Sequence, residues 1–483
     1  MKILHYALGF PPYRSGGLTK YCIDLMVQQK QAGNEVAMMW PGAFRLTGHF
    51  VRLKHSKKKV VFGEKQTEID SYEVINPLPV PLDEGIIYVE KFMMKCPNPK
   101  AYEEFLKTYQ PDAIHVHTLM GLHREFLKTA KSMGIKIVFT AHDYFGICPK
   151  VTLFRDDAVC DGDCGKCGKC NQSALSLKKI RILQSGLYRG LKDTSIVKKM
   201  RKAHRNEFFN ETESDNNDEV KKNRVNKESE IFEKEKRKEM ITERFGNMIV
   251  DESTRRYENL RKYYISMWKL MDVIHFNSSV TESVYRGFIP DTIKGKVIHI
   301  SHGNIADNRR LKNFGQEKLG ITYLAPAKNF KGYGIMKQAL DEIWIEGNRN
   351  FHLTMYNEAQ IAAPYATVNS RFAYEELEEI FEKTDVLIMP SVWYETFGFT
   401  VLEALSYGVP VIVSENVGAK DLLEDGRFGM IVEPTVEGVK KGISELMANR
   451  KMLEEYNRQI VGHMNLRKII RFSDEIEKLY QQK

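Results

Sequence analysis

The chain has 483 residues, 42% of them hydrophobic and 28% charged, which excludes a wholly disordered, collagen-like or low-complexity protein. Lys and Arg outnumber Asp and Glu by 72 to 63. This mild excess fits anionic substrates or an anionic membrane surface and does not argue for nucleic acid as a partner. At about 150 residues per domain the length allows two or three domains, and no run of about 18 apolar residues predicts a membrane-spanning helix.

The first half of the chain alternates apolar, strand-like segments with helical ones. Residues 2–8 predict a strand instead of a signal peptide, and residues 17–33 predict a helix that stops at Gly33. Further strands are expected over 34–40, 112–118 and 135–143. This βαβ order predicts a parallel sheet whose ligands gather at the carboxyl ends of the strands.

The second half repeats the strand and helix alternation after a strongly charged stretch that predicts a solvated helix or, second, disorder. We therefore predict an α/β fold of two Rossmann-like domains that face each other across a crevice. The predicted segments are an N-terminal domain at 1–290 with a Cys-rich loop at 148–171 and a charged insert at 195–262, a C-terminal domain at 291–465, and a helix at 466–483 that packs back on the N-terminal domain.

The most informative stretch is DVLIMPSVWYETFGFTVLEALSYGVP. A buried strand leads to a loop with Glu395, and a helix then begins near Gly398 and ends at Gly408. At about 1.5 Å rise per helical residue, Glu395 and Glu403 should lie on the order of 10 Å apart with the helix N-terminus between them. A helix N-terminus favours a phosphate group, and carboxylates accept hydrogen bonds from hydroxyls. This arrangement fits a nucleotide sugar.

This stretch resembles the E-x7-E signature of the family-4-like retaining glycosyltransferases of the two-domain GT-B type, and the resemblance covers most of the chain except the charged insert. In that family the first Glu meets the donor hexose and the second binds the ribose. The resemblance therefore gives these roles to Glu395 and Glu403. It also implies that Thr396, Phe397 and Gly398 offer backbone amides to the sugar and the phosphate.

Two N-terminal segments match the same family. Gly16 and Gly17, before the first helix, leave room for the backbone to approach a diphosphate. His142 lies in a T-x-H-D segment, where the family places a His beside the transferred sugar. His115 and His117 share one face of a strand, and for them we expect hydrogen-bonded core positions.

A third segment, LAPAKNFKGYG, matches the family in part. Lys331 and Gly332 fit its Lys-Gly pair, and Lys331 is expected to neutralise the leaving diphosphate. Pro326 occupies the position of the family's Arg, so either Lys328 or Arg371 must supply the second cation.

Four cysteines follow the spacing C-x3-C-x2-C-x2-C, namely Cys160, Cys164, Cys167 and Cys170. Short turns between the thiols suit a tetrahedral ion, so we predict structural zinc ahead of free thiols and an iron–sulfur cluster. Cys148 is an alternative ligand. The ion is expected to shape an acceptor-side loop, and no cofactor is implied in catalysis. Seven cysteines without a secretory signal indicate a reducing compartment, and hence a cytoplasmic protein.

The segment 176–193 interleaves Lys and Arg with apolar residues, which fits either an anionic lipid surface or packing on the N-terminal domain. The resemblance implies a retaining transferase that moves a sugar from a nucleoside diphosphate sugar to a glycan or lipid-linked acceptor in cell-surface polysaccharide assembly, at the inner membrane face. Two rivals stay open. One is a nucleotide-sugar epimerase of the same fold. The other is a catalytically silent glycan-binding or scaffolding protein, because Pro326, Tyr356 and Asn357 depart from the family pattern.

Overall fold

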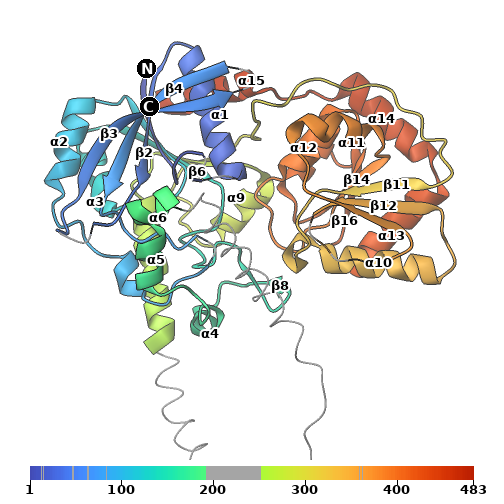
Figure 1. Cartoon of the computed structure of the whole chain (residues 1–483), viewed down its shortest axis with the longest axis horizontal. Helices are drawn as coiled ribbons and strands as arrows, with labels where there is room; N and C mark the ends of the chain where they lie inside the picture. Colours follow the sequence, from blue (N-terminus) through green and yellow to red (C-terminus); the bar gives the residue numbers. More distant parts are fainter. Residues whose placement is uncertain are drawn as a thin grey trace, which may run out of the picture.

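The computed structural model describes residues 1–11, 13–14, 16–45, 48–62, 65–82, 84–191, 252–357, 359, 361 and 363–482. It contains two α/β domains side by side, each built on its own sheet (Figure 1). The predicted α/β fold of two Rossmann-like domains is confirmed. We call the part built on the eight-stranded sheet the N-terminal domain and the part built on the six-stranded sheet the C-terminal domain.

The sheet of the N-terminal domain has the order β10-β9-β6-β5-β1-β2-β4-β3. Strands β1 and β5 are almost fully buried, because helices cover both faces of the sheet. All neighbours are parallel except β3 and β4. The strands are β1 (Lys2–Tyr6), β2 (Glu35–Pro41), β3 (Arg52–Phe62), β4 (Lys65–Ile75), β5 (Ala113–Val116), β6 (Lys136–Ala141), β9 (Val273–Phe276) and β10 (Gly295–Val297).

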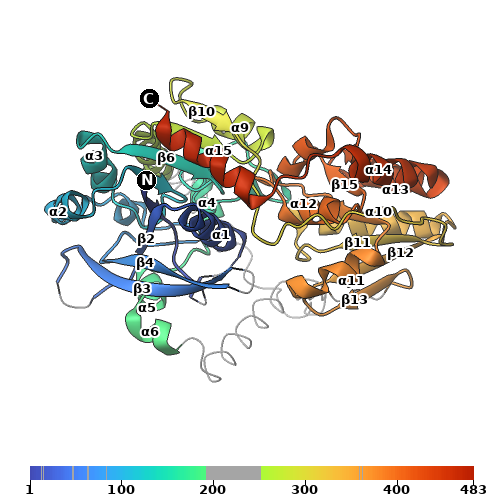
Figure 2. The ribbon, with the colours of Figure 1, turned by 90° about the horizontal axis from the view of Figure 1, so that it is seen from above.

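Helices of the N-terminal domain pack on both faces of this sheet (Figure 2). They are α1 (Gly17–Gln31), α2 (Lys100–Tyr109), α3 (Arg124–Ser132), α9 (Ser279–Arg286), and a helix over 252–268. The Cys-rich region adds short elements: β7 (Phe154–Arg155), β8 (Ala158–Val159), η2 (Cys164–Lys166), α4 (Cys167–Cys170), α5 (Leu177–Leu183) and α6 (Gly186–Leu191), while η1 (Val89–Phe92) precedes α2.

The sheet of the C-terminal domain is entirely parallel, with the order β13-β12-β11-β14-β15-β16. Its strands are β11 (Leu319–Tyr323), β12 (Phe351–Tyr356), β13 (Ala366–Asn369), β14 (Val386–Met389), β15 (Val411–Ser414) and β16 (Gly429–Val432). Its helices and turns are η3 (Asn329–Lys331), α10 (Tyr333–Ile345), η4 (Tyr374–Glu376), α11 (Leu377–Glu382), α12 (Phe399–Ser406), η5 (Gly418–Leu423), α13 (Val436–Ala448) and α14 (Lys451–His463).

The last helix, α15 (Ile469–Gln481), leaves the C-terminal domain and lies across the N-terminal domain beside α1 (Figure 2). Its buried face includes Phe472, Ile476 and Tyr480. Strand β10 pairs with β9 although it follows residue 290, where we had placed the domain boundary. The chain therefore passes to the second sheet only after Val297.

The charged insert predicted at 195–262 lies mostly outside the described residues. Residues 252–262 belong to the helix over 252–268. In the described part of the chain, no helix combines the length and the apolar character needed to cross a bilayer.

Candidate functional site

A cavity of about 290 Å³ lies between the two domains, at the carboxyl ends of β6, β9 and β14. The domains touch beside it, because the carbonyl of Thr396 accepts hydrogen bonds from Ser278 Oγ at 2.9 Å and Thr281 Oγ1 at 2.8 Å. Seven of the ten residues predicted for catalysis and donor binding line this cavity, namely Gly17, His142, Lys331, Glu395, Thr396, Phe397 and Gly398.

Two helix N-termini meet at the cavity. Gly17 begins α1, and α12 begins after Gly398. Gly16 and Gly398, which precede these helices, have φ values of 103° and 107°, a region that glycine adopts at little cost. A Cβ at Gly17 would touch the ring of Phe399 on α12 at 3.7 Å, so the two helix starts are close. Amide groups and positive dipole ends from both domains therefore face one space, as an anion site requires.

Lys331 and Glu395 form an ion pair at the wall of the cavity. Trp393 donates a hydrogen bond from Nε1 to Glu395 Oε2 at 3.1 Å, and its ring lies 4.6 Å from Lys331 Nζ. The two charged side chains are 18% and 13% exposed. A bound anion would find Lys331 already held in place, and a sugar hydroxyl would find a carboxylate with a fixed orientation.

Gly332 sets the position of Lys331. Its φ is 79°, and a Cβ added there would lie 1.9 Å from the carbonyl oxygen of Pro390. The turn that carries Lys331 thus runs directly against the chain that follows β14, an approach that only glycine permits.

We expect Gly332→Ala to lower the free energy of unfolding by about 2–4 kcal/mol, from left-handed backbone strain plus overpacking. The matched control is Gly347→Ala, because Gly347 has a similar φ of 91° but nothing within 4 Å of the added Cβ. That control should cost only about 1 kcal/mol. Urea denaturation of both variants tests this, and equal losses would show that the contact with Pro390 does not matter.

His142 lies at the end of β6 and links the cavity to the interior of the N-terminal domain. Its Nε2 is 3.3 Å from Nδ1 of His117, and its carbonyl accepts a hydrogen bond from Thr396 Oγ1 at 3.0 Å. Burial lowers the pKa of His142 to about 3, so the ring is neutral at pH 7. Its neighbour Asp143 has its pKa raised to about 6 by burial.

Glu403 lines a second, smaller cavity of about 160 Å³, which lies further along α12. It is only 4% exposed. His302 Nε2 lies 3.1 Å from Glu403 Oε1 but is out of line for a hydrogen bond. Burial and the nearby Glu403 carboxylate raise the pKa of Tyr374, which lines the same cavity. A buried acid beside two ring systems suits the hydroxyls and the base of a nucleoside.

Four residues named as candidates for donor binding do not line the cavity at the domain boundary. Glu403 lines the smaller cavity, Gly16 precedes the lining residue Gly17, and Lys328 and Arg371 are exposed on the C-terminal domain. Pro326 does line it. Among the cavity-lining residues that the structure describes, Lys331 is thus the sole Lys or Arg.

Asn277 is a site residue that we did not predict. It follows β9, lines the cavity and is 1% exposed. Neither its Nδ2 nor its Oδ1 has a hydrogen-bond partner among the described residues. An unpaired buried amide is costly, so a ligand that satisfies it gains affinity. The sequence did indicate this position, because a polar residue directly follows the buried apolar strand β9.

The cysteines of the predicted metal site lie in one region but not at ligand spacing. A hydrogen bond with the Cys167 thiol lowers the pKa of Cys164 to about 7, and burial raises the pKa of Cys148 to about 11. Among the described residues, no three of Cys148, Cys160, Cys164, Cys167 and Cys170 have their sulfur atoms within 4.8 Å of one another. Zinc binding stays a prediction that requires this loop to close around the ion.

Comparisons with known families match a segment in each domain. Residues 15–157 match the family described as Glycosyltransferase Family 4, and residues 366–460 match Glycosyl transferases group 1. Each of the two segments, one in each domain, is thus similar to a glycosyltransferase family. The first matched segment holds Gly16, Gly17 and His142, and the second holds Glu395 and Glu403.

Curated relatives match the chain over short stretches. An uncharacterized 41.2 kDa protein in the cps region of Klebsiella pneumoniae is 45% identical over 58 residues, 12% of this chain and 16% of that protein. D-inositol 3-phosphate glycosyltransferase of Paenarthrobacter aurescens is 31% identical over 111 residues, 21% of this chain and 27% of that protein. The chain therefore matches about a quarter or less of the length of these relatives.

Solved structures resemble the whole chain. Sucrose-phosphate synthase from Thermosynechococcus elongatus has a TM-score of 0.54 at 14% identity, covering 100% of this chain and 98% of that one. Anabaena HepE in complex with UDP has a TM-score of 0.55 at 10% identity and full coverage of both chains. The two α/β domains are thus arranged as in the GT-B fold.

Proposed function

We propose that the protein is a retaining glycosyltransferase that moves a sugar from a nucleoside diphosphate sugar to a glycan or lipid-linked acceptor in cell-surface polysaccharide synthesis. The observation that carries the proposal is the convergence of two helix N-termini, Lys331 and Glu395 on one cavity between the domains. The relative in a cps region and the neighbour HepE, solved with UDP and with UDP-glucose, support this choice.

The diphosphate is expected to bind at the N-termini of α1 and α12, where backbone amides and Lys331 meet its negative charge. As the bond to the sugar breaks, charge grows on the departing phosphate oxygen. Lys331 and the helix ends then stabilise the transition state more than the ground state. The nucleoside would extend along α12 to Glu403, whose carboxylate accepts hydrogen bonds from ribose hydroxyls.

The sugar itself is expected between Glu395, His142 and Asn277. Glu395 is the sole carboxylate among the described residues that line the cavity, and it is held by Lys331 and Trp393. A carboxylate committed to that ion pair suits hydroxyl binding better than nucleophilic attack. Substitution on one face of the sugar, with the leaving phosphate accepting the acceptor's proton, therefore fits the site and retains the anomeric configuration.

The acceptor is expected in a larger hollow of about 650 Å³ at the other side of the domain boundary. Cys160 and Asp161 of the Cys-rich loop line it together with Phe288, Tyr394 and Lys420. An ion held by the cysteines would fix this wall and take no part in the chemistry.

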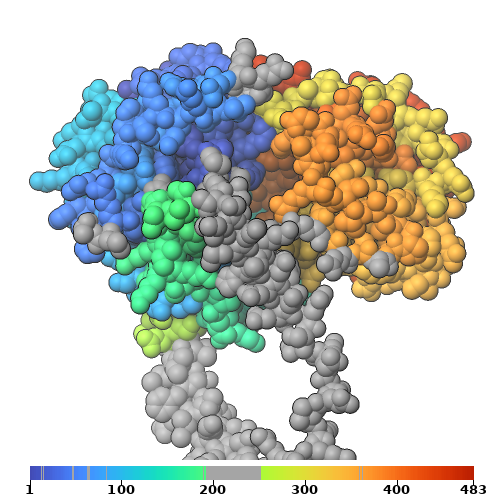
Figure 3. Space-filling model, viewed as in Figure 1, coloured from blue at the N-terminus to red at the C-terminus, as the bar shows by residue number. Residues whose placement is uncertain are grey.

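A membrane contact is also part of the proposal. Helices α5 and α6 carry Ile182, Leu187 and Leu191, which are 61%, 75% and 46% exposed. Lys178 and Lys179 are exposed on the same segment, which is green in Figure 3 and lies on the surface. Apolar side chains beside lysines suit an anionic lipid surface.

We expect vesicles with anionic lipid to sediment the protein and neutral vesicles to leave most of it in solution. Ile182→Ser with Leu187→Ser should weaken this binding about 100-fold, since burying one Ile or Leu side chain is worth about 1.5–3 kcal/mol. The control is Ile345→Ser, because Ile345 is 82% exposed but lies on α10 of the other domain. Equal loss in the control would exclude α5 and α6 as the lipid contact.

Turnover decides between the transferase and its rivals. Purified protein is mixed with nucleoside diphosphate sugars, with and without a lipid-linked glycan acceptor, and both released nucleotide and converted sugar are measured. Transfer that needs the acceptor and is lost in Glu395→Ala supports the proposal. Conversion of the donor sugar alone identifies an epimerase. No binding and no turnover of any nucleotide sugar overturns the enzyme proposal and favours a glycan-binding role.

A further inference from the structure

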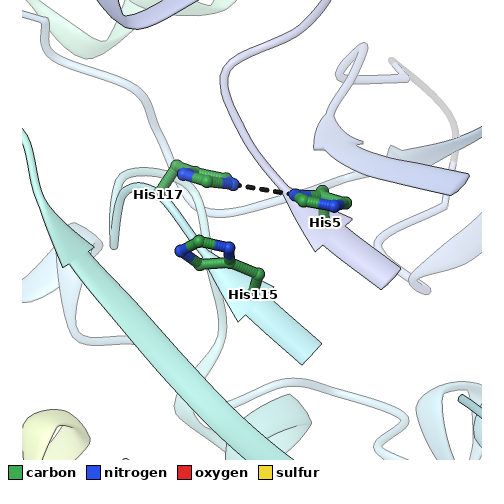
Figure 4. A group of neighbouring side chains, drawn as sticks. All are labelled: His5, His115 and His117. Carbon is green, nitrogen blue, oxygen red and sulfur yellow. Dashed lines mark hydrogen bonds between the residues drawn. The ribbon is translucent and has the colours of Figure 1, made fainter. Parts of the chain in front are cut away.

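A chain of eight hydrogen bonds runs through the interior of the N-terminal domain and ends at His142. Figure 4 shows three of its members, His5, His115 and His117, which project from β1 and from the end of β5. All members except His142 are buried. In order, the chain joins His142, His117, His5, Gln29, Tyr480, His115, Thr140, His275 and the carbonyl of Ile298.

The carbonyl of Ile298 fixes which atom is the donor in every hydrogen bond of this series. A carbonyl only accepts, so His275 Nε2 donates to Ile298 O at 2.7 Å and, in a neutral ring, leaves Nδ1 as an acceptor. Thr140 Oγ1, 2.9 Å away, must then donate to that Nδ1. Having used its proton, Thr140 accepts from His115 Nε2 at 2.6 Å, and His115 Nδ1 becomes an acceptor in turn.

The next hydrogen bonds run from His115 through Tyr480 on the C-terminal helix α15 to His5 on β1, and each has a fixed donor. Tyr480 on α15 must donate its hydroxyl proton to His115 Nδ1 at 2.7 Å, so its oxygen accepts from Gln29 Nε2 at 3.1 Å. The amide of Gln29 is thereby oriented with Oε1 towards His5, whose Nε2 donates to it at 2.8 Å. His5 Nδ1 is consequently an acceptor.

The last two links reach the cavity. His117 Nε2 donates to His5 Nδ1 at 2.9 Å, and His142 Nε2 donates to His117 Nδ1 at 3.3 Å. The remaining ring nitrogen, Nδ1 of His142, has no hydrogen-bond partner among the described residues. It is not fully buried, because it is absent from the buried polar atoms that lack a partner. His142 is one of the residues that line the cavity.

All five histidine rings are neutral, and a neutral imidazole has one donor and one acceptor nitrogen. Burial lowers the pKa of His5 and His275 to about 4, and that of His142 to about 3. It lowers the pKa of His115 and His117 well below the usual range. Each ring therefore has one donor and one acceptor at pH 7, and each proton has one place in the chain.

We propose that this chain holds His142 in the tautomer with its proton on Nε2, so that Nδ1 accepts a hydrogen bond from a hydroxyl of the bound sugar. Gln29 and Tyr480 are then positioning residues, although neither lines the cavity. The identity of the hydroxyl donor as a sugar rests on the proposed function. The tautomer of His142 does not.

A metal ion is the alternative use of the same cluster. One nitrogen from each of His5, His115 and His117 lies within 4.8 Å of the other two. Every ring nitrogen of these three residues already has a hydrogen-bond partner, so an ion would have to break several links. The intact hydrogen bonds therefore favour a role in fixing proton positions over a role in binding a metal ion.

Histidine ¹⁵N NMR tests the tautomer directly. Protein labelled on its 13 histidines is prepared with a chelator, and the His142 signals are assigned by their loss in His142→Gln. The proposal predicts a neutral ring protonated on Nε2 at pH 7. A ring protonated on Nδ1, or on both nitrogens, would overturn it, as would one metal ion per chain that resists the chelator and is lost in His5→Asn.

Tyr480→Phe tests the role of α15. Without the hydroxyl, the Gln29 amide can turn over, and the whole chain as far as His142 can reverse. We expect the Nδ1-protonated tautomer to appear at His142 and turnover to fall about tenfold, the scale of one hydrogen bond to a substrate hydroxyl. The control is Glu477→Ala, because Glu477 accepts from Asn34 at 3.0 Å and so ties the same helix to the same domain outside the chain.

The two variants separate positioning from simple docking of α15. If Glu477→Ala changes the His142 signals as much as Tyr480→Phe, or if Tyr480→Phe leaves them unchanged, the positioning role fails. If the unmodified protein turns over no nucleotide sugar, the proposed function fails while the NMR result still decides the tautomer.

Discussion

Lys331→Met is expected to reduce kcat on the order of 100- to 1000-fold, the effect of removing one preorganised group that stabilises transition-state charge. Lys331 is the sole Lys or Arg among the described residues that line the cavity, and Pro326 takes the place where the resemblance expects an Arg. Among the described residues that line the cavity, Lys331 is therefore the one positively charged side chain that can neutralise the departing diphosphate. Steady-state kinetics with the preferred donor measure the effect, because the loss should appear in kcat more than in KM.

The control for this variant is Lys328→Met. Lys328 is exposed and does not line the cavity, yet it lies only three residues earlier and was our alternative source of the second cation. Its replacement should leave kcat nearly unchanged. The melting temperature of both variants must also be compared, since Lys331→Met leaves the Glu395 carboxylate without its ion-pair partner. A folded Lys331→Met protein with normal kcat would contradict the assigned role.

Glu403→Gln is expected to raise the KM for the donor about 10- to 100-fold with little change in kcat. Hydrogen bonds to a charged group are worth about 1.5–3 kcal/mol, and ribose hydroxyls make them equally in the ground state and the transition state. The carboxylate is 4% exposed beside His302 and Tyr374. Donor titration and steady-state kinetics measure the change.

Glu375→Gln is the matched control for Glu403→Gln. Glu375 lines the same small cavity but is exposed, so its charge is screened by water and a loss there should be small. A larger effect in kcat than in KM at Glu403, or an equal effect at Glu375, would show that the ribose is bound elsewhere.

The sequence predicted both sheets because most of their strands are buried apolar runs. In the N-terminal domain, β3 and β4 were not predicted, because charged and polar residues such as Lys57, Lys58 and Lys59 of β3 interrupt their apolar pattern. As an edge strand, β3 can carry charge on its exposed side, and lysines there discourage pairing with another chain. Local patterns thus predict apolar strands better than charged ones, since the internal strand β4 was also missed.

The site was predictable where function lies at the end of a strand or the start of a helix. Glu395, Lys331 and His142 occupy such places, and all three line one cavity. The pairing of Tyr480 with His115 was not predictable, because these residues are separated by 365 positions and only tertiary packing brings them together. Asn277 was missed for a related reason, because only the three-dimensional structure shows that its side-chain amide lacks hydrogen-bond partners.

Calorimetric titration of the unmodified protein with a panel of nucleoside diphosphate sugars tests the central claim most directly. The proposed function predicts that at least one of them binds with a stoichiometry of about one per chain, since Lys331 and Glu395 meet at a single cavity among the described residues. It also predicts that Glu403→Gln weakens this binding while Glu375→Gln does not. Absence of binding by every nucleoside diphosphate sugar, with a folded protein, would contradict it.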